Sequence, residues 1–464
     1  MATSNKDAQF LIAMSISFTL AVFLHRFGHP KYKKEILSLF GLLLVILFCG
    51  YGTIQLLMMT TVTTCMIKSR KCSPRLAFVY CLAHRVIYCS SKYYDHITLG
   101  NAMMLVATIK MITVAYEINE YQRHKKELSS DQEDECNGGS KTPWLGLNSE
   151  PTVLDVFCYM TCLWGIFTGP IFTYKTYDDS MREQVPAVPF KNTALENFKK
   201  LALIVGLLLI ASRFISTSAL REDSFYEALF PIRLFHSALI ALLFQLRFVG
   251  AWIFMETVYV LAGFGVYPVS TDPRPGKGPT RALTEDDGIS LLHPTEEEYT
   301  FRTVSNIKPL QVLSNVSFRE SFRCWNCCVQ WWLSHFVYSS NIFPKQSKLI
   351  RGQATLLVSA MWHGVLPGYY VAFLPIPLVI FAENLCFCSL QSRLTSERGE
   401  KIYNMIHWLF LKIFIFAMTF SNFILLDYDS ILRFNKSMYY YLISFPLFCI
   451  ILCKTVDFIL PHSD

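Results

Sequence analysis

Apolar residues in this chain gather into long blocks that alternate with short polar or basic segments. The blocks are not amphipathic stripes, so they suit helices surrounded by lipid or by other apolar helices. The pattern predicts an all-α polytopic membrane protein with about ten to twelve transmembrane helices, although some blocks are short for a full crossing. The blocks are Ala8–Leu24, Ile36–Gly50, Thr53–Ile67, Leu76–Ser91, Ala102–Tyr116, Val153–Tyr174, Leu201–Ile215, Phe225–Leu246, Ala251–Tyr267, Phe322–Tyr338, Ala354–Leu385, Tyr403–Leu426 and Met438–Leu460.

The two longest polar stretches, at about residues 117–151 and 268–309, are predicted to be solvated loops. The first is rich in acidic residues, and the second is rich in proline, glycine and charge. Neither holds an apolar segment long enough to build a separate core, and the chain has no clear internal repeat. We therefore expect a single integral membrane domain over residues 1–464.

Composition supports the membrane class and excludes others. The 464 residues are 52% hydrophobic and only 17% charged, whereas soluble domains carry about 25% charged residues. The net charge is +7, and the basic residues cluster in short loops, which is typical of loops that face anionic lipid in the cytosol. Because the basic residues form no aromatic-interleaved patch, nucleic acid is not expected as a partner.

The fifteen cysteines do not form a convincing metal motif. Most of them lie inside apolar blocks, where cysteine behaves as a small hydrophobic residue. The spacings Cys324-x-x-Cys327 and Cys386-x-Cys388 are suggestive, but neither is followed by a second Cys/His pair at zinc-finger distance. We expect neither a metal ion nor another cofactor.

A histidine, His363, lies inside a run that is otherwise apolar from Ala354 to Phe381. An imidazole in hydrocarbon needs a polar partner or a cavity, and ionisable residues at membrane depth are functional candidates by default. The alternative is a core histidine that is satisfied by a neighbouring carbonyl. Ser359 lies one helical turn earlier on the same face, where it could assist the histidine or simply bond to its own helix.

Asn326 lies in a second motif upstream, Trp-Asn-x-x-Val-Gln-Trp-Trp-Leu at Trp325–Leu333. Together with Ser-Ala-x-Trp-His-Gly-x-x-Pro-Gly-Tyr-Tyr at Ser359–Tyr370, it resembles the signature of the membrane-bound O-acyltransferase (MBOAT) family. The resemblance covers most of the chain and is strongest from about Tyr299 to Asn384. It implies a helical fold that encloses a substrate tunnel, with Asn326 and His363 as the catalytic residues.

Direct acyl transfer from a thioester requires a base for the acceptor hydroxyl, donors for the developing oxyanion and exclusion of water. Neutral histidine suits the role of base, and asparagine can donate to the carbonyl oxygen or hold the acceptor hydroxyl. A covalent route through Cys324, Cys327 or Cys328 remains open, as does a supporting role for Glu383.

The resemblance extends to the lysophosphatidylinositol acyltransferase branch of the family, through Val329–Leu333 and the Thr-Gly-Pro…Tyr-x-Thr-Tyr run that ends at Tyr177. Two departures are Leu366, where that branch has a histidine, and Cys327-Cys328, where it has a Met-Thr-like pair. Substrates and partners implied are acyl-CoA as co-substrate, a lysophospholipid acceptor and membrane lipids, in the endoplasmic reticulum and related endomembranes. The substrate-binding candidates are Trp325, Gln330, Trp331, Trp332, Ser359, Trp362, Tyr369, Tyr370, Lys345, Lys348, Arg351, Thr168, Tyr174 and Tyr177.

Several alternatives stay open from the sequence. Lys345, Lys348 and Arg351 fit the phosphates of acyl-CoA, but ordinary cytosolic loop charge explains them equally well. The acceptor could instead be a serine or ethanolamine lysolipid or a protein hydroxyl. A transporter is disfavoured because no repeat or paired charges accompany the motifs. Oligomeric state and use of the glycosylation sequons at Asn315 and Asn435 are not predicted.

Overall fold

The computed structural model describes residues 2–27, 30–69, 73–96, 98–131, 144–182, 190–282, 295–340 and 346–460. Within these residues nearly all regular structure is helical, which confirms the all-α class; two short strands, β1 (Tyr267–Pro268) and β2 (Tyr299–Thr300), pair antiparallel. The chain divides into two compact units that alternate along the sequence, and this division does not test the predicted single domain. Unit 1 is Met1–Leu201, Ala251–Asn306 and Cys327–Trp332, and unit 2 is Ala202–Gly250, Ile307–Asn326 and Leu333–Asp464.

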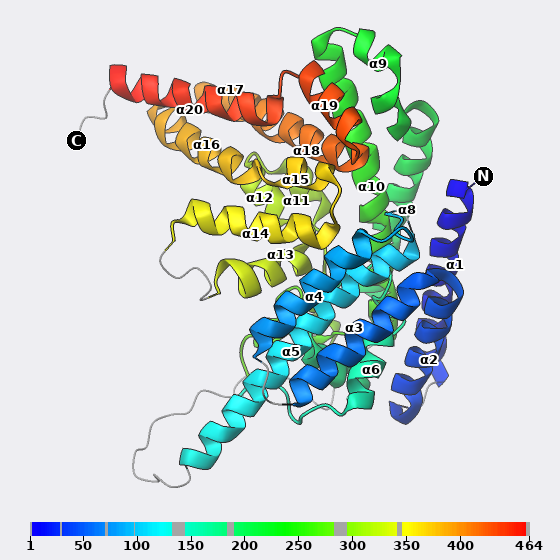
Figure 1. Ribbon diagram of the computed structural model, residues 1–464. Helices are drawn as coiled ribbons and strands as arrows, with labels where there is room; N and C mark the ends of the chain where they lie inside the picture. The colour runs from blue at the N-terminus through cyan, green and yellow to red at the C-terminus, as the bar shows by residue number, and fades with distance from the viewer. Residues whose placement is uncertain are drawn as a thin grey trace. The chain divides into compact units, whose positions relative to one another are not determined.

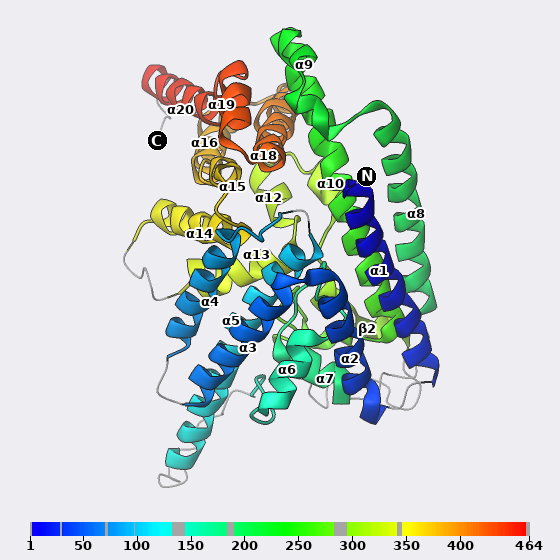
Figure 2. The same ribbon diagram turned by 45° about the vertical axis from the view of Figure 1, so that its right-hand side comes forward.

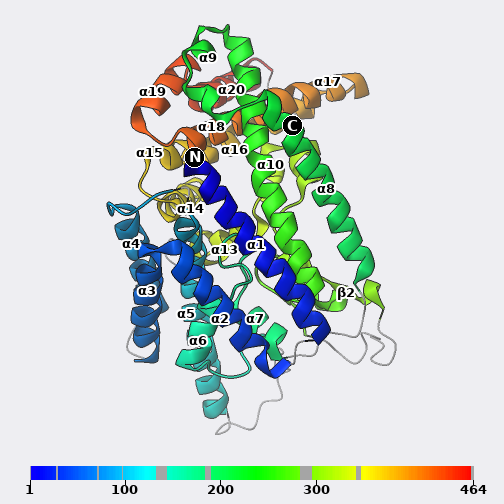
Figure 3. The same ribbon diagram turned by 90° about the vertical axis from the view of Figure 1, so that its right-hand side faces the viewer.

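Unit 1 contains the N-terminal helices. Figure 1 shows α3, α4 and α5 side by side, and their mutual contacts bury most of the apolar part of α5. In Figure 3, α1 lies beside the unit 1 ends of α8 and α10, where the ring of Phe18 contacts Phe198 and Phe254. The unit 1 helices are α1 (Ala2–Phe27), α2 (Pro30–Cys49), α3 (Tyr51–Lys68), α4 (Pro74–Cys89), α5 (Leu99–Asp131), α6 (Val153–Thr161), α7 (Tyr174–Arg182), η2 (Val269–Thr271), η4 (Glu296–Glu298), η5 (Arg302–Val304) and α13 (Cys327–Leu333, with its last residue in unit 2), and it shares α8 (Lys191–Phe214) and α10 (Phe230–Ala262) with unit 2.

Unit 2 is built around α18, whose residues are nearly all buried. Figure 1 shows α16 and α20 side by side, and in Figure 2 α15 lies between α14 and α18. One apolar core joins α10, α12, α16, α18 and α20. The remaining unit 2 elements are η1 (Thr217–Arg221), α9 (Asp223–Glu227), α11 (Pro309–Ser314), α12 (Phe318–Arg323), η6 (Ser334–Tyr338), α14 (Lys348–His363), α15 (Pro367–Phe373), α16 (Ile376–Ser389), η7 (Gln391–Arg393), α17 (Glu397–His407), η8 (Trp408–Ile413), α18 (Phe414–Leu425), α19 (Tyr428–Ser437) and α20 (Tyr441–Ile459).

Six helical stretches among the described residues are long and apolar enough to cross a membrane, which supports a polytopic membrane protein. They are Lys6–Leu24, Leu99–Ser129, Phe230–Ala262, Pro367–Arg393, Glu397–Leu425 and Tyr428–Ile459. Agreement with the predicted ten to twelve spans requires that shorter or more polar helices, such as α2, α3, α4 and α8, also cross the bilayer.

Three sequence-based boundaries are wrong. The spans predicted at Phe225–Leu246 and Ala251–Tyr267 form one helix, α10, because a single interior glycine at Gly250 costs only about 1 kcal/mol. Conversely, the span predicted at Val153–Tyr174 is broken after α6, and residues 162–173 are not helical. Gly165 (φ 83°) and Gly169 (φ 72°) adopt left-handed conformations there, which a continuous helix does not allow.

The polar stretch from residue 117 is also helical at its start, because α5 continues to Asp131. Its first charged residue, Glu117, is half-buried and accepts hydrogen bonds from the backbone N–H groups of Tyr174 (2.8 Å) and Lys175 (3.0 Å). Residues 132–143 lie outside the described part of the chain.

The second polar stretch, residues 268–309, is more closely packed than a solvated loop. β1 and β2 lie within it, the N–H of Gly276 donates to the carbonyl of Thr303 (2.8 Å), and Thr271, Thr303 and Asn306 are buried. Among its described residues, backbone pairing satisfies many of the backbone N–H and C=O groups without an apolar core of its own. Residues 283–294 lie outside the described part.

Candidate functional site

Asn326 lies in a break between two short helices rather than inside the predicted span Phe322–Tyr338. In unit 2, α12 ends at Arg323 and the carbonyl of Cys324 accepts the N–H of Lys308 at 3.1 Å. Asn326 itself has φ 50°, a left-handed conformation in which asparagine is enriched among non-glycine residues. The break frees its side chain from the packing of a regular helix face.

In unit 1, the first turn of α13 is fixed by the side chain and backbone of Asn306. Its carbonyl accepts the N–H of Cys327 at 2.7 Å, and its Oδ1 accepts the N–H of Cys328 at 3.2 Å. The N–H of Asn306 in turn donates to Glu256 at 2.6 Å. Asn306 is 1% exposed, so these bonds are shielded from water and hold the residues after Asn326 firmly.

His363 is the last residue of α14. The predicted span Ala354–Leu385 is in fact three helices, α14, α15 and α16, because Gly364 (φ 148°) and Pro367 end one helix and begin the next. The imidazole is surrounded by rings, with centroid distances of 4.6 Å to Trp362, 5.4 Å to Tyr369, 5.2 Å to Phe373 and 4.9 Å to Phe423. His363 is half-buried in this aromatic setting, and rings around the reacting group limit the access of water.

The turn after His363 is held tightly against the end of α18. The N–H of Gly368 donates to the carbonyl of Leu426 at 3.2 Å, and a Cβ at position 368 would lie 2.7 Å from the Cα of Leu426. Only glycine fits this approach, which explains the Pro-Gly-Tyr-Tyr pattern physically. Tyr369 and Ala360 pack with Leu426 in the same cluster.

Helix α18 connects the two motifs within unit 2. The ring of Trp325 contacts Phe420 (5.2 Å between centroids), and the ring of His363 contacts Phe423 (4.9 Å). Phe420 and Phe423 are three residues apart, so they are neighbours on one helix surface. Trp325, which precedes Asn326, and His363 therefore contact adjacent turns of α18.

The other predicted site residues of unit 2 lie on α14 and α15. Ser359 and Trp362 are buried, and Tyr370 packs half-buried against the Tyr369 cluster. Lys348 is exposed in the first turn of α14, whereas the Arg351 guanidinium lies 4.8 Å from the ring of Tyr338. Lys345 lies outside the described residues.

Six predicted site residues belong to unit 1, where aromatic packing dominates. Trp332 is fully buried and stacks on Phe78 with 6.0 Å between ring centroids, and Trp331 lies against Gly276. Gln330 is half-buried on the same helix. The Thr168 carbonyl accepts the indole N–H of Trp252 at 3.1 Å, and Tyr174 and Tyr177 pack against Tyr159.

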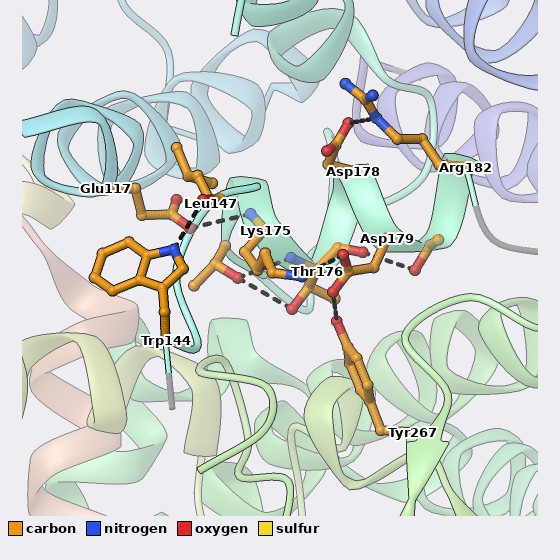
Figure 4. A network of polar contacts seen from close by, with 11 residues as sticks. Glu117, Trp144, Leu147, Lys175, Thr176, Asp178, Asp179, Arg182 and Tyr267 are labelled. Atoms are coloured by element: carbon orange, nitrogen blue, oxygen red, sulfur yellow. Dashed lines mark hydrogen bonds and ion pairs between the residues drawn. The ribbon is translucent and has the colours of Figure 1, made fainter. Parts of the chain in front are cut away.

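Figure 4 shows the polar network that surrounds α7. Glu117 faces the start of the helix, Asp178 pairs with Arg182, and Lys175 pairs with Asp179. The Tyr267 hydroxyl donates to the second carboxylate oxygen of Asp179 at 2.8 Å. The part of the Thr-Gly-Pro…Tyr-x-Thr-Tyr pattern that lies on α7 is thus fixed by ion pairs within the helix and by hydrogen bonds to Glu117 and Tyr267.

The sequence left a supporting role open for Glu383, but it did not predict the buried polar cluster that this residue forms with His407 in unit 2. Glu383 (1% exposed) and His407 (4% exposed) lie 3.1 Å apart, Oε1 to Nε2. The available signal was a carboxylate inside an apolar block, which membrane physics makes conspicuous. His407 also lies inside a predicted apolar block, Tyr403–Leu426, but its pairing with Glu383 could not be predicted because no local pattern joins the two residues. Within the described ranges, no three His, Cys, Asp or Glu side chains are grouped to hold a metal ion.

The fold and this site define an all-α, multi-spanning membrane protein whose motif histidine and asparagine lie at helix breaks lined by aromatic rings. A model of the MBOAT, membrane-bound O-acyltransferase family matches residues 37–426, and the chain belongs to this family. It is therefore an O-acyltransferase of the membrane.

Relatives cover nearly the whole chain. The membrane-bound acylglycerophosphatidylinositol O-acyltransferase MBOAT7 of Homo sapiens is 33% identical over 444 residues, which is 94% of this chain and 91% of the relative. Its namesake in Danio rerio is 32% identical over 92% of this chain and 89% of the relative. The Drosophila melanogaster enzyme frj, with the same description, is 29% identical over 73% of this chain and 69% of its own.

Proposed function

We propose that this protein transfers an acyl chain from acyl-CoA to the sn-2 hydroxyl of a lysophospholipid, with lysophosphatidylinositol as the preferred acceptor, in phospholipid remodelling. The observation that carries the proposal is the full-length similarity to acylglycerophosphatidylinositol O-acyltransferases, with both Asn326 and His363 inside the matched region. The endoplasmic reticulum and related endomembranes are the proposed location, because they contain both substrates' membrane pools.

In the proposed mechanism, His363 accepts the proton of the lysolipid hydroxyl while the hydroxyl oxygen attacks the thioester carbonyl. The C–S bond breaks, and the proton passes to the CoA thiolate, so the products are a diacyl phospholipid and free CoA. Asn326 donates a hydrogen bond to the developing oxyanion or fixes the acceptor hydroxyl. The rings of Phe373 and Phe423 around the imidazole support the exclusion of water that the thioester needs.

The acyl donor is proposed to reach the histidine through a tunnel, with its phosphates near the start of α14. Lys348 is exposed there, and Arg351 keeps guanidinium edges for hydrogen bonds while its face stacks on Tyr338. A polyunsaturated chain is the proposed preference. Lys345 is part of the same proposal from the sequence alone.

The acceptor assignment has one specific competitor. Leu366 replaces the histidine of the lysophosphatidylinositol branch, and it packs with the Tyr369 cluster beside His363. Val365-Leu366 partly resembles the phosphatidylserine and phosphatidylethanolamine branch, so a serine or ethanolamine lysolipid is the second candidate. The similarity to the inositol-specific relatives outweighs this one position, because it extends over 94% of the chain.

The test uses purified protein in detergent with one labelled polyunsaturated acyl-CoA and equal amounts of inositol, serine, ethanolamine and choline lysolipids. We expect the inositol lysolipid to give the highest kcat/KM, and His363→Ala protein to give background incorporation with every acceptor. A higher kcat/KM for the serine or ethanolamine lysolipid would replace the acceptor assignment and keep the acyltransferase reaction. No transfer to any lysolipid would overturn the proposal.

A further inference from the structure

Glu383 of α16 is a carboxylate almost completely removed from water in an apolar helix. Burial of a charged group in such a place is costly, and replacement by well-packed apolar residues commonly stabilises a protein. Such a group therefore needs an explanation other than stability. Its contacts supply one, because the carboxylate faces the short helix that leads to Asn326.

Three donors from the start of α12 converge on this carboxylate. The Ser317 hydroxyl donates to Oε2 at 3.0 Å, the N–H of Phe318 donates to Oε1 at 2.5 Å, and the N–H of Arg319 donates to Oε2 at 3.1 Å. A carboxylate at a helix N-terminus satisfies N–H groups that have no partner within the helix and complements the helix dipole. Glu383 thus fixes where α12 begins and in which direction it points.

His407 completes the arrangement from α17. Its Nε2 lies 3.1 Å from Oε1 of Glu383, and its Nδ1 lies 3.3 Å from the Tyr403 hydroxyl. A chain in which Tyr403 donates to His407 and His407 donates to Glu383 satisfies all three groups and orients the carboxylate. The pair is closed to solvent, and it joins α16 and α17 at the point where the donors of α12 meet the carboxylate.

The residues that follow His407 also bind α11, the helix before α12. Directly after His407, the backbone forms the π-helical turn η8, a rare form that is frequent at functional sites. Both the Trp408 indole (2.8 Å) and the Lys412 ammonium donate to the carbonyl of Leu313, the penultimate residue of α11. The segment that carries Asn326 is therefore anchored at two points by polar groups from α16, α17 and η8.

We propose that Glu383 and His407 are positioning residues for the acyl transfer, a role that rests on the proposed function of Asn326 and His363. The pair fixes α12, and α12 ends at Arg323, three residues before Asn326. The Trp325 ring packs on Phe420, one turn from the Phe423 ring that contacts His363. A shift at the start of α12 is thereby passed to Asn326, and a displacement of about 1 Å can cost about 10²-fold in rate.

The test compares Glu383→Gln and His407→Gln with a control on α20, Asp457→Asn, whose carboxylate also bonds to α16. Asp457 bonds to Ser389 (2.7 Å) and Arg393 (3.0 Å) at the far end of α16, away from α12. We expect kcat per folded molecule to fall about 10- to 100-fold in both glutamine variants, with KM for either substrate within about threefold. Asp457→Asn should keep wild-type kcat.

Hydrogen exchange supplies a readout of position. The amides of Phe318 and Arg319 should exchange faster in Glu383→Gln, whereas amides inside α18 should not change. If Glu383→Gln fails to fold, His407→Gln carries the test, because it leaves the three α12 donors on the carboxylate. Wild-type kcat in His407→Gln, or an equal loss in Asp457→Asn, would overturn the inference. Wild-type kcat in Asn326→Asp would instead overturn the catalytic assignment on which it rests.

Discussion

Two glutamates perform the same task in the two units, but their surroundings differ. In unit 1, Glu117 of α5 is half-buried and accepts the first two N–H groups of α7. In unit 2, Glu383 of α16 is 1% exposed, accepts three donors from the start of α12 and pairs with His407. Both cap a short helix that carries a family motif or leads to one.

The difference lies in how many other contacts fix the capped helix. Beyond Glu117, α7 is held by Tyr267 through Asp179, and by Lys33 and the N–H of Gly265, which both donate to Ser180 at 3.1 and 2.9 Å. At the start of α12, by contrast, three donors converge on a single buried carboxylate, and the Phe318 ring adds apolar packing against Phe416 with 4.8 Å between ring centroids. We infer that Glu117 adds to the contacts that already fix α7, whereas Glu383 determines the position of α12.

The largest expected effect is at His363. If unit 2 performs the chemistry, His363→Ala should lose about 10²–10⁴-fold in kcat, because that is the usual contribution of a general base. The ring lies at the end of α14, so its removal should leave the helices intact. Turnover of each acceptor by purified, monodisperse protein measures this. Near-normal kcat would show that the aromatic site around position 363 is structural.

Asn326 allows a sharper experiment, because its backbone is left-handed (φ 50°). Asn326→Asp keeps the side-chain volume and tolerates this φ but removes the amide donor, and Asn326→Gly keeps the backbone and removes the side chain. Loss of one oxyanion donor costs about 2.7–4 kcal/mol, so both variants should lose about 10²–10³-fold in kcat. If Asn326→Gly stays active, the residue serves the turn and not the reaction.

Glu117→Gln tests the other side of the comparison. We expect it to lower stability by about 1.5–3 kcal/mol at most, the range for hydrogen bonds to a charged group. Since Tyr267, Lys33 and Gly265 still hold α7, kcat per folded molecule should stay within about threefold, or roughly 0.6 kcal/mol. The measurements are the thermal unfolding temperature and kcat of Glu117→Gln, compared with those of Glu383→Gln. An equal fall in kcat for both variants would remove the distinction between the two caps.

The membrane class and the two motifs could be predicted from the sequence, because apolar blocks and a histidine within one are local signals. The helix breaks at Gly165, Gly169 and Asn326 could not be placed, since left-handed residues depend on tertiary contacts that over-determine them. At Gly250 the sequence predicted a break that does not exist, because packing outweighs the low helix propensity of glycine, which costs about 1 kcal/mol. The Glu383–His407 pair joins residues distant in sequence, so no local pattern announces it.

A third capping carboxylate, Glu296 of η4, gives the smallest expected effect and shows what a half-buried cap without a charged partner among the described residues contributes. It accepts the N–H groups of Asn192 (3.3 Å) and Thr193 (2.8 Å) at the start of α8. Its partial burial acts to raise the pKa, but the hydrogen bonds from Thr193 and Asn192 prevail and lower it from the ordinary 4.5. Because the folded pKa is depressed, the stabilisation is present above pH 4.5 and is lost as the pH falls through the lower folded value.

Glu296→Gln should therefore unfold at a slightly lower temperature than wild type at pH 7, and the difference should shrink below about pH 4. Glu297→Gln, which removes the same charge from the adjacent exposed position, is the matched control and should show no such pH dependence. Both glutamates lie on η4 in unit 1, whereas Asn326 and His363 lie in unit 2, so kcat should not change in either variant. A Glu296→Gln deficit that persists unchanged at pH 4 would mean that packing, not the charge-assisted cap, holds η4 to α8. Glu296 would then no longer serve as a charge-assisted cap to compare with the buried Glu383–His407 pair.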